Sequence, residues 1–449
     1  MKEIQSEVRY KALRCLIAIR ERGAYSNIIT DRAASTLEDD RDRALLSSLV
    51  LGVTERKITL DYIIKTLAAR SESDIDTDVN EILRLGIYQL KYMDRIPKRA
   101  AVCETVKLGK NASQRSFINA ILRAYIRKEN DIEFPKKEKN FARYLSVKYS
   151  FPRETCRFFL NLFGEDRTRE YFEYFNSVPP LCLRVNTLKI SRDDFISLLN
   201  EKITEKKSAC CDSTVKKCAS CDSAVIVESG AVRDIPGYSD GLFFVQDISS
   251  QTAVKVLGAR EGSTVYDVCA APGGKSFGIA MEMKNRGKVY SFDIHKSKLS
   301  LIDSGAGRLG IDIIKTAQRD ASLPPKPSEY NDAEYVMCDV PCSGLGVLGK
   351  KADMRYRDIG SVKELPKLQY EILTQSAKLL KVGGELVYST CTVNPAENEG
   401  VIDRFVLEHN SFEFVEFNAD GGMRDGKHTF HPKLEEHDGF FISKIKRIK

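Results

Sequence analysis

The chain has 449 residues, too many for a single hydrophobic core, so two or three domains are expected. Hydrophobic residues make up 42% and charged residues 30%, which excludes a disordered or fibrous protein. The net charge of +7 permits a nucleic-acid partner without requiring one. Because no apolar run reaches the roughly 18 residues that cross a bilayer and no signal sequence follows Met1, we expect a cytoplasmic protein without a membrane partner, whose 12 cysteines are reduced.

Amphipathic helices are expected throughout the first third of the chain. Apolar residues recur there at intervals of three or four, with charged residues on the other faces. The recurring positions are Val8, Ala12, Leu16 and Ile19; Leu45, Leu49 and Val53; Ile82, Gly86, Leu90 and Met93; and residues 117–123. The charged stretch 128–139 contains Pro135 and breaks the pattern, which places an all-helical first domain at residues 1–135.

Residues 136–237 carry mixed signals and are expected to form a small connecting subdomain, with a strand at residues 183–187. A polar insert at residues 204–224 contains four cysteines, Cys210, Cys211, Cys218 and Cys221. The spacing of the last two suits zinc, but the adjacent first two are an unusual second half of such a site. The pattern therefore favours a variable loop without a metal.

Short apolar strands alternate with helices in residues 238–449, the third predicted domain. The expected strands are 264–268, 288–293, 334–338, 385–389, 412–417 and 440–445. A helix is expected from Val362 to Leu380. Such alternation predicts a Rossmann-like, mostly parallel sheet, for which we expect seven strands, and the whole chain is therefore multidomain, α and α/β.

The stretch Asp267–Ser276 follows a predicted strand and precedes a helix. Its small residues let the backbone approach a ligand closely, although the spacing of a P-loop is absent. Asp293 ends the next strand, 288–293, where a carboxylate can accept hydrogen bonds from ribose hydroxyls. Asp320 ends a further candidate strand, the third in chain order, which precedes 334–338, and there it could meet an adenine amino group. Each aspartate alone is typical of a solvated loop or helix cap, but their succession at strand ends indicates a nucleotide-like ligand.

Two cysteines follow neighbouring strands of the predicted sheet. The fourth strand leads into Asp339–Gly346, which contains Cys342, and the fifth leads into Ser389–Pro395, which contains Cys391. A lone buried cysteine is usually a small hydrophobic residue. Two cysteines at one carboxyl edge, beside an aspartate and a ligand-binding loop, indicate chemistry.

At these residues the chain resembles the Sun/Fmu (RsmB) group of RNA cytosine-5 methyltransferases. The stretches that match the family motifs in the catalytic half, in order, are 244–247, 269–276, 339–346, 389–392 and 438–441. The first third resembles the NusB-like RNA-binding domain that RsmB enzymes carry, in residues 51–53, 83–90, 96–97 and 117–123. The resemblance covers nearly the whole chain and implies 16S (small-subunit) ribosomal RNA as the partner.

The resemblance also implies the roles of the site residues. S-adenosylmethionine would be wrapped by Cys269, Ala270, Ala271, Pro272, Gly273, Gly274 and Lys275, with Asp293 on the ribose and Asp320 near the adenine. Asp339 would lie between cofactor and target base, and together with Lys275 belongs to the catalytic set. Cys391 would be the nucleophile that adds to carbon 6 of the cytosine, a step that suits a thiolate, and Cys342 would assist product release. DNA cytosine methyltransferases use the Pro-Cys cysteine instead, so this assignment rests on the resemblance.

Other features are expected to modify RNA binding without changing the chemistry. Ala352 and Tyr356 stand where the family commonly has proline and tryptophan, in a loop expected near the RNA. The connecting subdomain is expected to take part in RNA recognition, with phosphate contacts from Lys136, Lys137, Lys139, Arg143 and Lys148, unless these merely form a solvated face. The five histidines show no ligand or triad spacing and are expected at the surface, and no metal is needed.

Three alternatives remain open. A transfer-RNA cytosine-5 methyltransferase would share every catalytic feature. A non-catalytic RNA-binding ribosome-assembly factor would keep the fold, but it has no physical need for either thiol. A DNA methyltransferase is disfavoured because no large recognition insert is present, and we expect a monomer that does not bind DNA.

Overall fold

The computed structural model describes residues 2–23, 25–68, 75–178, 181–205, 215–218, 221–227, 232–433 and 437–449. The chain divides into two compact units. One, here called the helical unit, comprises Met1–Ser177 and Leu348–Ile359; the other, the α/β unit, comprises Val178–Val347 and Gly360–Lys449. The domain boundaries expected at residues 135 and 237 stay predictions.

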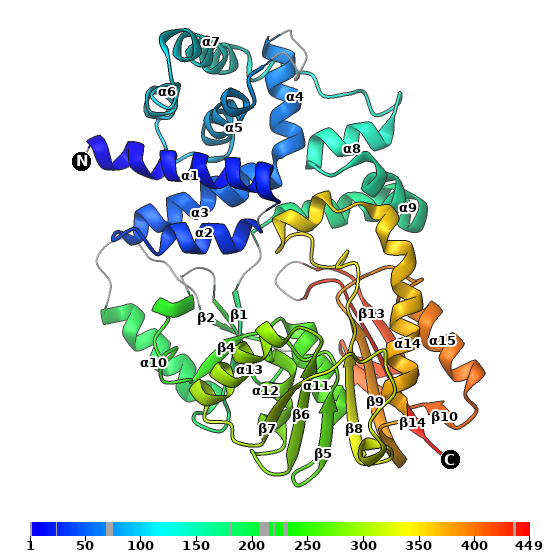
Figure 1. The fold of residues 1–449 in the computed structure, drawn as a ribbon. Helices are drawn as coiled ribbons and strands as arrows, with labels where there is room; N and C mark the ends of the chain where they lie inside the picture. The colour runs from blue at the N-terminus through cyan, green and yellow to red at the C-terminus, as the bar shows by residue number, and fades with distance from the viewer. Residues whose placement is uncertain are drawn as a thin grey trace. The chain divides into compact units, whose positions relative to one another are not determined.

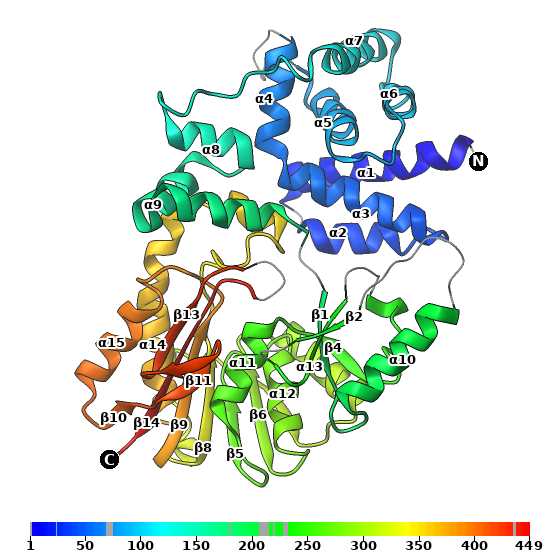
Figure 2. The same cartoon turned by 180° about the vertical axis from the view of Figure 1, so that it is seen from behind.

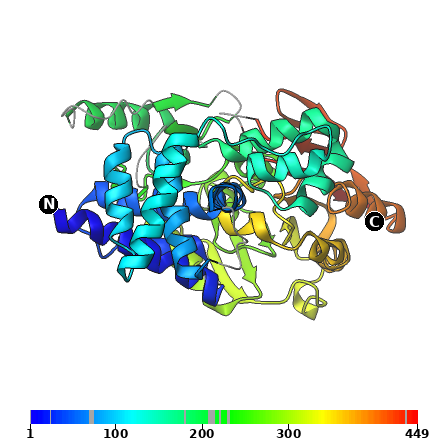
Figure 3. The ribbon, with the colours of Figure 1, turned by 90° about the horizontal axis from the view of Figure 1, so that it is seen from above.

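Nine helices of the first 177 residues build the helical unit, as counted over its described residues (Figures 1 and 3). They are α1 (Lys2–Arg22), α2 (Ser26–Ala34), α3 (Asp40–Glu55), α4 (Lys57–Ala68), α5 (Thr77–Tyr92), α6 (Lys98–Val106), α7 (Ala112–Lys128), α8 (Phe141–Tyr149) and α9 (Arg153–Asn176). Capping side chains fix several starts: Asp39, Asp76 and Asn111 each accept a backbone N–H of the first turn. The predicted apolar positions, such as Val8 and Leu49, lie in one core, which confirms the helical first third.

The segment Leu348–Ile359 belongs to the helical unit although sequence analysis assigned it to the third domain. It contains the short 3₁₀ helix η4 (Ala352–Tyr356). The buried guanidinium of Arg355 donates to Asn176 Oδ1 at 2.7 Å, to the Leu348 carbonyl at 3.1 Å and to the Phe175 carbonyl. These contacts tie the segment to the end of α9. Tyr356, which was expected in a loop near the RNA, donates its hydroxyl to the Glu55 carbonyl at 3.2 Å.

A small antiparallel sheet opens the α/β unit. Its strands, in the order β2-β3-β1-β4, are β1 (Leu181–Val185), β2 (Val215–Lys217), β3 (Ala224–Val227) and β4 (Phe243–Val245), and α10 (Arg192–Glu205) shares their core. Part of the polar insert is therefore not a plain loop, because β2 lies inside it. Cys218 and Cys221 are buried beside Cys182, while Cys210 and Cys211 lie outside the described residues.

The main sheet confirms the mostly parallel α/β prediction. Its order is β10-β14-β9-β8-β5-β6-β7, with strands β5 (Thr264–Asp267), β6 (Lys288–Asp293), β7 (Ile314–Gln318), β8 (Ala333–Asp339), β9 (Leu380–Thr390), β10 (Phe412–Phe414), β13 (Lys427–Phe430) and β14 (Phe440–Arg447). The run from β9 to β7 is parallel, and β14 is antiparallel to β9. Among the described residues the sheet has eight strands where seven were expected, because β10 and β13 are separate strands that pair with successive parts of β14. The predicted strand 412–417 ends early, and Phe417 begins a separate hairpin of β11 (Phe417–Ala419) and β12 (Gly422–Arg424).

Helices cover both faces of this sheet (Figure 2). One core joins the sheet to α11 (Ile248–Leu257), α12 (Gly274–Glu282) and α13 (Lys296–Leu309), and a second joins it to α14 (Leu365–Ala377) and α15 (Glu399–Glu408). This doubly wound arrangement leaves the carboxyl ends of the parallel strands to build a site. Among the described helices, none is both long and apolar enough to cross a membrane.

Candidate active site

The loop between β5 and α12 forms one wall of a cavity of about 250 Å³ at the carboxyl edge of the sheet. The residues of this loop that line the cavity are Cys269, Ala270, Ala271, Pro272, Gly274 and Lys275. Gly273 adopts a φ of +108°, and a Cβ atom there would lie 2.5 Å from the ring of Phe277. Both the backbone conformation and the packing therefore demand glycine at this position. Gln246 and Asp247 line the opposite side, next to β4.

Asp267 ends β5 at the floor of the same cavity and is fully buried. Its Oδ2 accepts the Ser276 hydroxyl at 2.6 Å, while Oδ1 has no hydrogen-bond partner among the described residues. Burial raises the pKa of Asp267 to about 7, against the lowering effect of the Ser276 hydrogen bond. A buried carboxylate oxygen without a donor is suited to a cationic ligand. Sequence reasoning assigned no role to Asp267, although its place at a strand end is the signal that singled out Asp293.

The two other aspartates lie at the expected strand ends but do not line the cavity. Asp293 is the last residue of β6, and its Oδ1 accepts the amide of His295 at 2.8 Å. Asp320 lies two residues beyond β7, where its Oδ1 accepts the amide and the hydroxyl of Ser322. The geometry thus shows the local turn bonds that aspartates make in loops. Their roles toward ribose and adenine stay predictions.

Asp339 ends β8 and is held on both oxygens. Lys275 Nζ lies 2.7 Å from its Oδ2, and the Ser389 hydroxyl donates to its Oδ1 at 2.7 Å. Burial acts to lower the pKa of Lys275, but the charge and hydrogen bond of Asp339 outweigh it and raise that pKa. The lysine therefore stays protonated and fixes the carboxylate beside the cavity, where both residues form part of the wall.

The structure brings the two predicted cysteines together. Strands β8 and β9 are parallel neighbours with Asp339 opposite Ser389, so the loops that follow them lie side by side. Cys342 Sγ and Cys391 Sγ are 3.0 Å apart, beyond disulfide bonding distance, and both thiols are free. The hydrogen bond with Cys391, together with burial, raises the pKa of Cys342 well above the usual thiol range. Cys342 accordingly keeps its proton at neutral pH.

A buried glutamate joins the two cysteine loops. Glu397 Oε2 accepts the amide of Ser343 at 2.8 Å and the Gln369 side chain at 2.9 Å, and Oε1 accepts the Asn394 side chain at 2.9 Å. Ser343 follows Cys342, and Asn394 lies three residues beyond Cys391. Glu397 thereby fixes the distance between the loops that carry the thiols. Sequence reasoning missed it, because nothing in its local pattern separates it from a surface glutamate.

No group of three or more potential metal ligands occurs in the part of the chain that the structure describes. Of the histidines expected at the surface, His437 is instead buried, where its ring packs against Phe430 at 5.1 Å between ring centroids. The basic residues expected to contact RNA phosphates, Lys136, Lys137, Lys139, Arg143 and Lys148, are all exposed on the helical unit.

Comparison with known proteins supports the family resemblance independently of the site geometry. The family of 16S rRNA methyltransferases RsmB/F matches residues 254–446, the NusB family matches 6–127, and a ferredoxin-like domain of RsmF/B-type methyltransferases matches 158–229. The last match spans the cysteine-bearing insert at residues 204–224.

Relatives match along the entire length. The chain is 34% identical to the "Probable ribosomal RNA small subunit methyltransferase B" of Synechocystis, covering 98% of this chain and 99% of the relative. It is 33% identical to the protein of the same name in Bacillus subtilis, covering 99% of each. The crystal structure of PH0851 superimposes with a TM-score of 0.77 at 25% identity, covering 98% of this chain and 99% of that one. The chain therefore belongs to the RsmB family of ribosomal RNA small subunit methyltransferases.

Proposed function

We propose that this enzyme transfers a methyl group from S-adenosylmethionine to carbon 5 of a cytosine in small-subunit ribosomal RNA. The observation that carries the proposal is the pair of thiols 3.0 Å apart beside the Lys275–Asp339 ion pair. Methylation at carbon 5 requires a nucleophile that adds to carbon 6 and later departs, and a thiolate suits both steps. A binding protein would need neither thiol.

The cavity by the β5–α12 loop fits the cofactor in its donor and acceptor groups. Asp267, which lines the cavity and whose Oδ1 accepts no hydrogen bond from a described residue, suits the ammonium group of S-adenosylmethionine, and the loop Cys269–Lys275 lets the backbone approach the cofactor closely. Asp293 and Asp320 would meet the ribose and adenine beyond the cavity. When bound, the cofactor supplies the methyl group.

In this proposal the thiolate of Cys391 adds to carbon 6 of the cytosine and directs electron density to carbon 5. After methyl transfer the carbon 5 proton passes to a solvent water molecule, its C–H bonding pair forms the double bond between carbons 5 and 6, and the sulfur–carbon bond breaks with its electron pair returning to Cys391. Cys342, whose sulfur adjoins that of Cys391, assists this release. Asp339 keeps a lone pair on each oxygen and can accept a hydrogen bond from the cytosine amino group.

Methylation assays on purified small-subunit ribosomal RNA and transfer RNA test the substrate. We expect 5-methylcytosine in the ribosomal RNA with wild-type protein and none with Cys391→Ala, while Cys103→Ala, at an exposed cysteine of α6, stays active. Methylation of transfer RNA alone would replace the substrate in this proposal. Binding of ribosomal RNA without any methylation would favour the assembly-factor alternative.

A further inference from the structure

One cavity of the helical unit has no role in the proposed reaction. It measures about 370 Å³ and lies among α1, α3, the start of α4, α5 and η4, all within that unit. Its volume is in the range of pockets that hold small organic groups. Leu16 and Val53 supply apolar wall, and charged side chains supply the rest.

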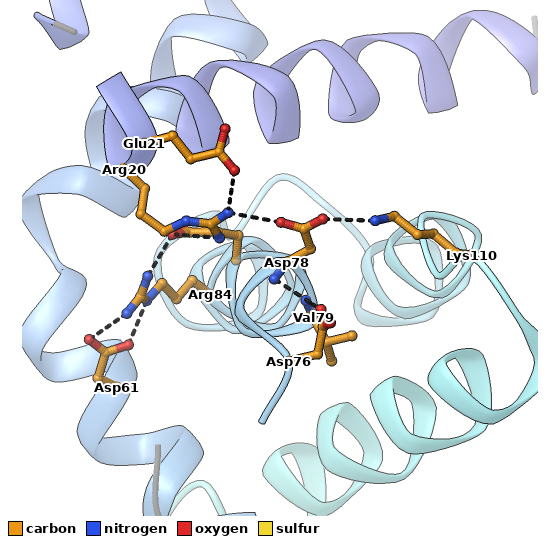
Figure 4. A network of polar contacts seen from close by, with 9 residues as sticks. Arg20, Glu21, Asp61, Asp76, Asp78, Val79, Arg84 and Lys110 are labelled. Atoms are coloured by element: carbon orange, nitrogen blue, oxygen red, sulfur yellow. Dashed lines mark hydrogen bonds and ion pairs between the residues drawn. The ribbon is translucent and has the colours of Figure 1, made fainter. Parts of the chain in front are cut away.

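The acidic groups of the wall are occupied by internal partners. Arg84 donates to both carboxylate oxygens of Asp61, at 2.5 and 2.8 Å (Figure 4). It also donates to Glu81 at 2.7 Å. Asp353, from the segment that follows the Cys342 loop, accepts the amide and the hydroxyl of Ser26 at 2.9 and 2.8 Å. These carboxylates stabilise the unit, and their charge is committed within it.

The basic groups of the wall are not fully used. Arg20 donates through Nη2 to Asp78 at 2.9 Å and to Glu21 at 3.1 Å, as Figure 4 shows. Its other terminal nitrogen, Nη1, is buried and makes no hydrogen bond to any described residue, although it forms an ion pair with Glu81 Oε1 at 4.0 Å. Lys57 is exposed at the rim, and within the described ranges its ammonium makes no ion pair. The cavity thus offers hydrogen-bond donors, which suit an anionic ligand rich in acceptors.

An aromatic ring stands at the same rim. Tyr25 lines the cavity, yet 68% of it is exposed, so one face is open for stacking. Unpaired RNA is recognised by stacking its bases on aromatic side chains while basic groups contact its phosphates. A stacking ring and a rim lysine beside one cavity together match one nucleotide.

We propose that this cavity binds a single unstacked nucleotide of the substrate RNA. The base stacks on Tyr25, and its phosphate contacts Lys57. The inference rests on the proposed function, which supplies RNA as the ligand. It gives the helical unit a nucleotide-binding cavity in addition to its exposed basic residues. Asp353 and Tyr356, which line the cavity, belong to the segment Leu348–Ile359. This segment begins six residues after Cys342, so residues of the cavity and of the catalytic loop are close together in the sequence.

RNA affinity of the full-length protein tests the proposal through Tyr25→Ala/Lys57→Ala. Both side chains are exposed, so the variant is expected to fold, and Tyr10→Ala/Lys65→Ala provides a control with an exposed tyrosine on α1 and an exposed lysine on α4. We expect the pocket variant to bind a small-subunit RNA fragment about tenfold more weakly, since stacking and one phosphate contact are lost. Lys57→Ala alone should lower the slope of log affinity against log salt by about one. The control should match wild type.

Two results would overturn the proposal. One is RNA affinity within twofold of wild type for the pocket variant. The other is tight binding of free cytidine or adenosine monophosphate that the same variant abolishes, because the cavity would then serve a small metabolite. Neither readout needs methylation, so failure of the proposed reaction with pocket-dependent RNA binding would leave this inference standing.

Discussion

The cavities of the two units leave opposite kinds of polar group open. In the α/β unit, Asp267 Oδ1 accepts no hydrogen bond, whereas in the helical unit Arg20 Nη1 donates none and faces Glu81 Oε1 only at 4.0 Å, each judged over the described residues. An open acceptor suits a cationic group such as the ammonium of the cofactor, and an open donor suits the phosphates and bases of RNA. Arg84 of the helical unit differs from both groups, because its charge is fully paired with Asp61 and Glu81. The comparison thus sets two cavity-lining groups that each lack a hydrogen bond on one atom against a guanidinium whose three nitrogens all donate.

The largest effect on stability is expected from breaking the closed network. Arg84→Met should lower the free energy of unfolding by about 3 kcal/mol, because it removes the hydrogen-bonded guanidinium from two largely buried carboxylates, of which Glu81 keeps only the 4.0 Å pair with Arg20. Urea titration measures the loss. Lys98→Met removes an exposed pair with Glu129 and should change stability by less than about 1 kcal/mol. Weaker cofactor binding by Arg84→Met without a stability loss would contradict the structural role.

The matching change at the open acceptor should have the reverse profile. Asp267→Asn is expected to weaken binding of S-adenosylmethionine about 10- to 100-fold, the worth of one charged hydrogen bond in a buried site. Its free energy of unfolding at pH 8 should equal or exceed that of wild type, since an ionised buried carboxylate is removed. Calorimetric titration and urea unfolding give both values, with Asp425→Asn in an exposed turn as control. Unchanged affinity would remove Asp267 from the cofactor site.

A pH series provides a second test of the role of Asp267 in cofactor binding. The pKa of Asp267 is raised to about 7, so between about pH 4 and pH 7 the folded protein holds a proton that the unfolded chain has lost. The contribution of Asp267 to the free energy of unfolding therefore falls as the pH rises through this range. Cofactor affinity should move the other way. It should fall as pH drops below about 7, by at most tenfold per pH unit, and Asp267→Asn should flatten the dependence. An identical slope in both proteins would contradict the assignment.

The smallest effect is expected at the helix cap. Asp353→Ala removes the carboxylate that accepts the first amide of α2, so the free energy of unfolding should fall by about 1 kcal/mol. Thermal unfolding measures it, and Asp353→Asn should recover most of the loss. A loss as large as that of Arg84→Met would mean that the cap is part of a larger network.

Sequence patterns predicted what depends on local periodicity. The strands around Val265, Val289 and Val387 were expected because each is a short apolar run between turn signals, and the order of motifs placed the two thiols at neighbouring strand ends. Pairings between distant residues were not accessible. Arg355 meets Asn176 across 179 residues, and Glu397 is contacted by Ser343 of the Cys342 loop and by Gln369 of α14. Whether Asp267 keeps an open oxygen is likewise decided by packing in space.

The central claim, that Cys391 is the nucleophile on a cytosine, is tested most directly by trapping the covalent adduct. Small-subunit RNA transcribed with 5-fluorocytidine would be incubated with wild-type protein and S-adenosylmethionine, since the fluorine at carbon 5 cannot leave as the proton does. Nuclease digestion and peptide mass spectrometry then locate the modified residue. The account predicts a nucleotide adduct on Cys391 that is absent from Cys391→Ala and retained in Cys342→Ala. An adduct on Cys342, or methylation by Cys391→Ala, would contradict it.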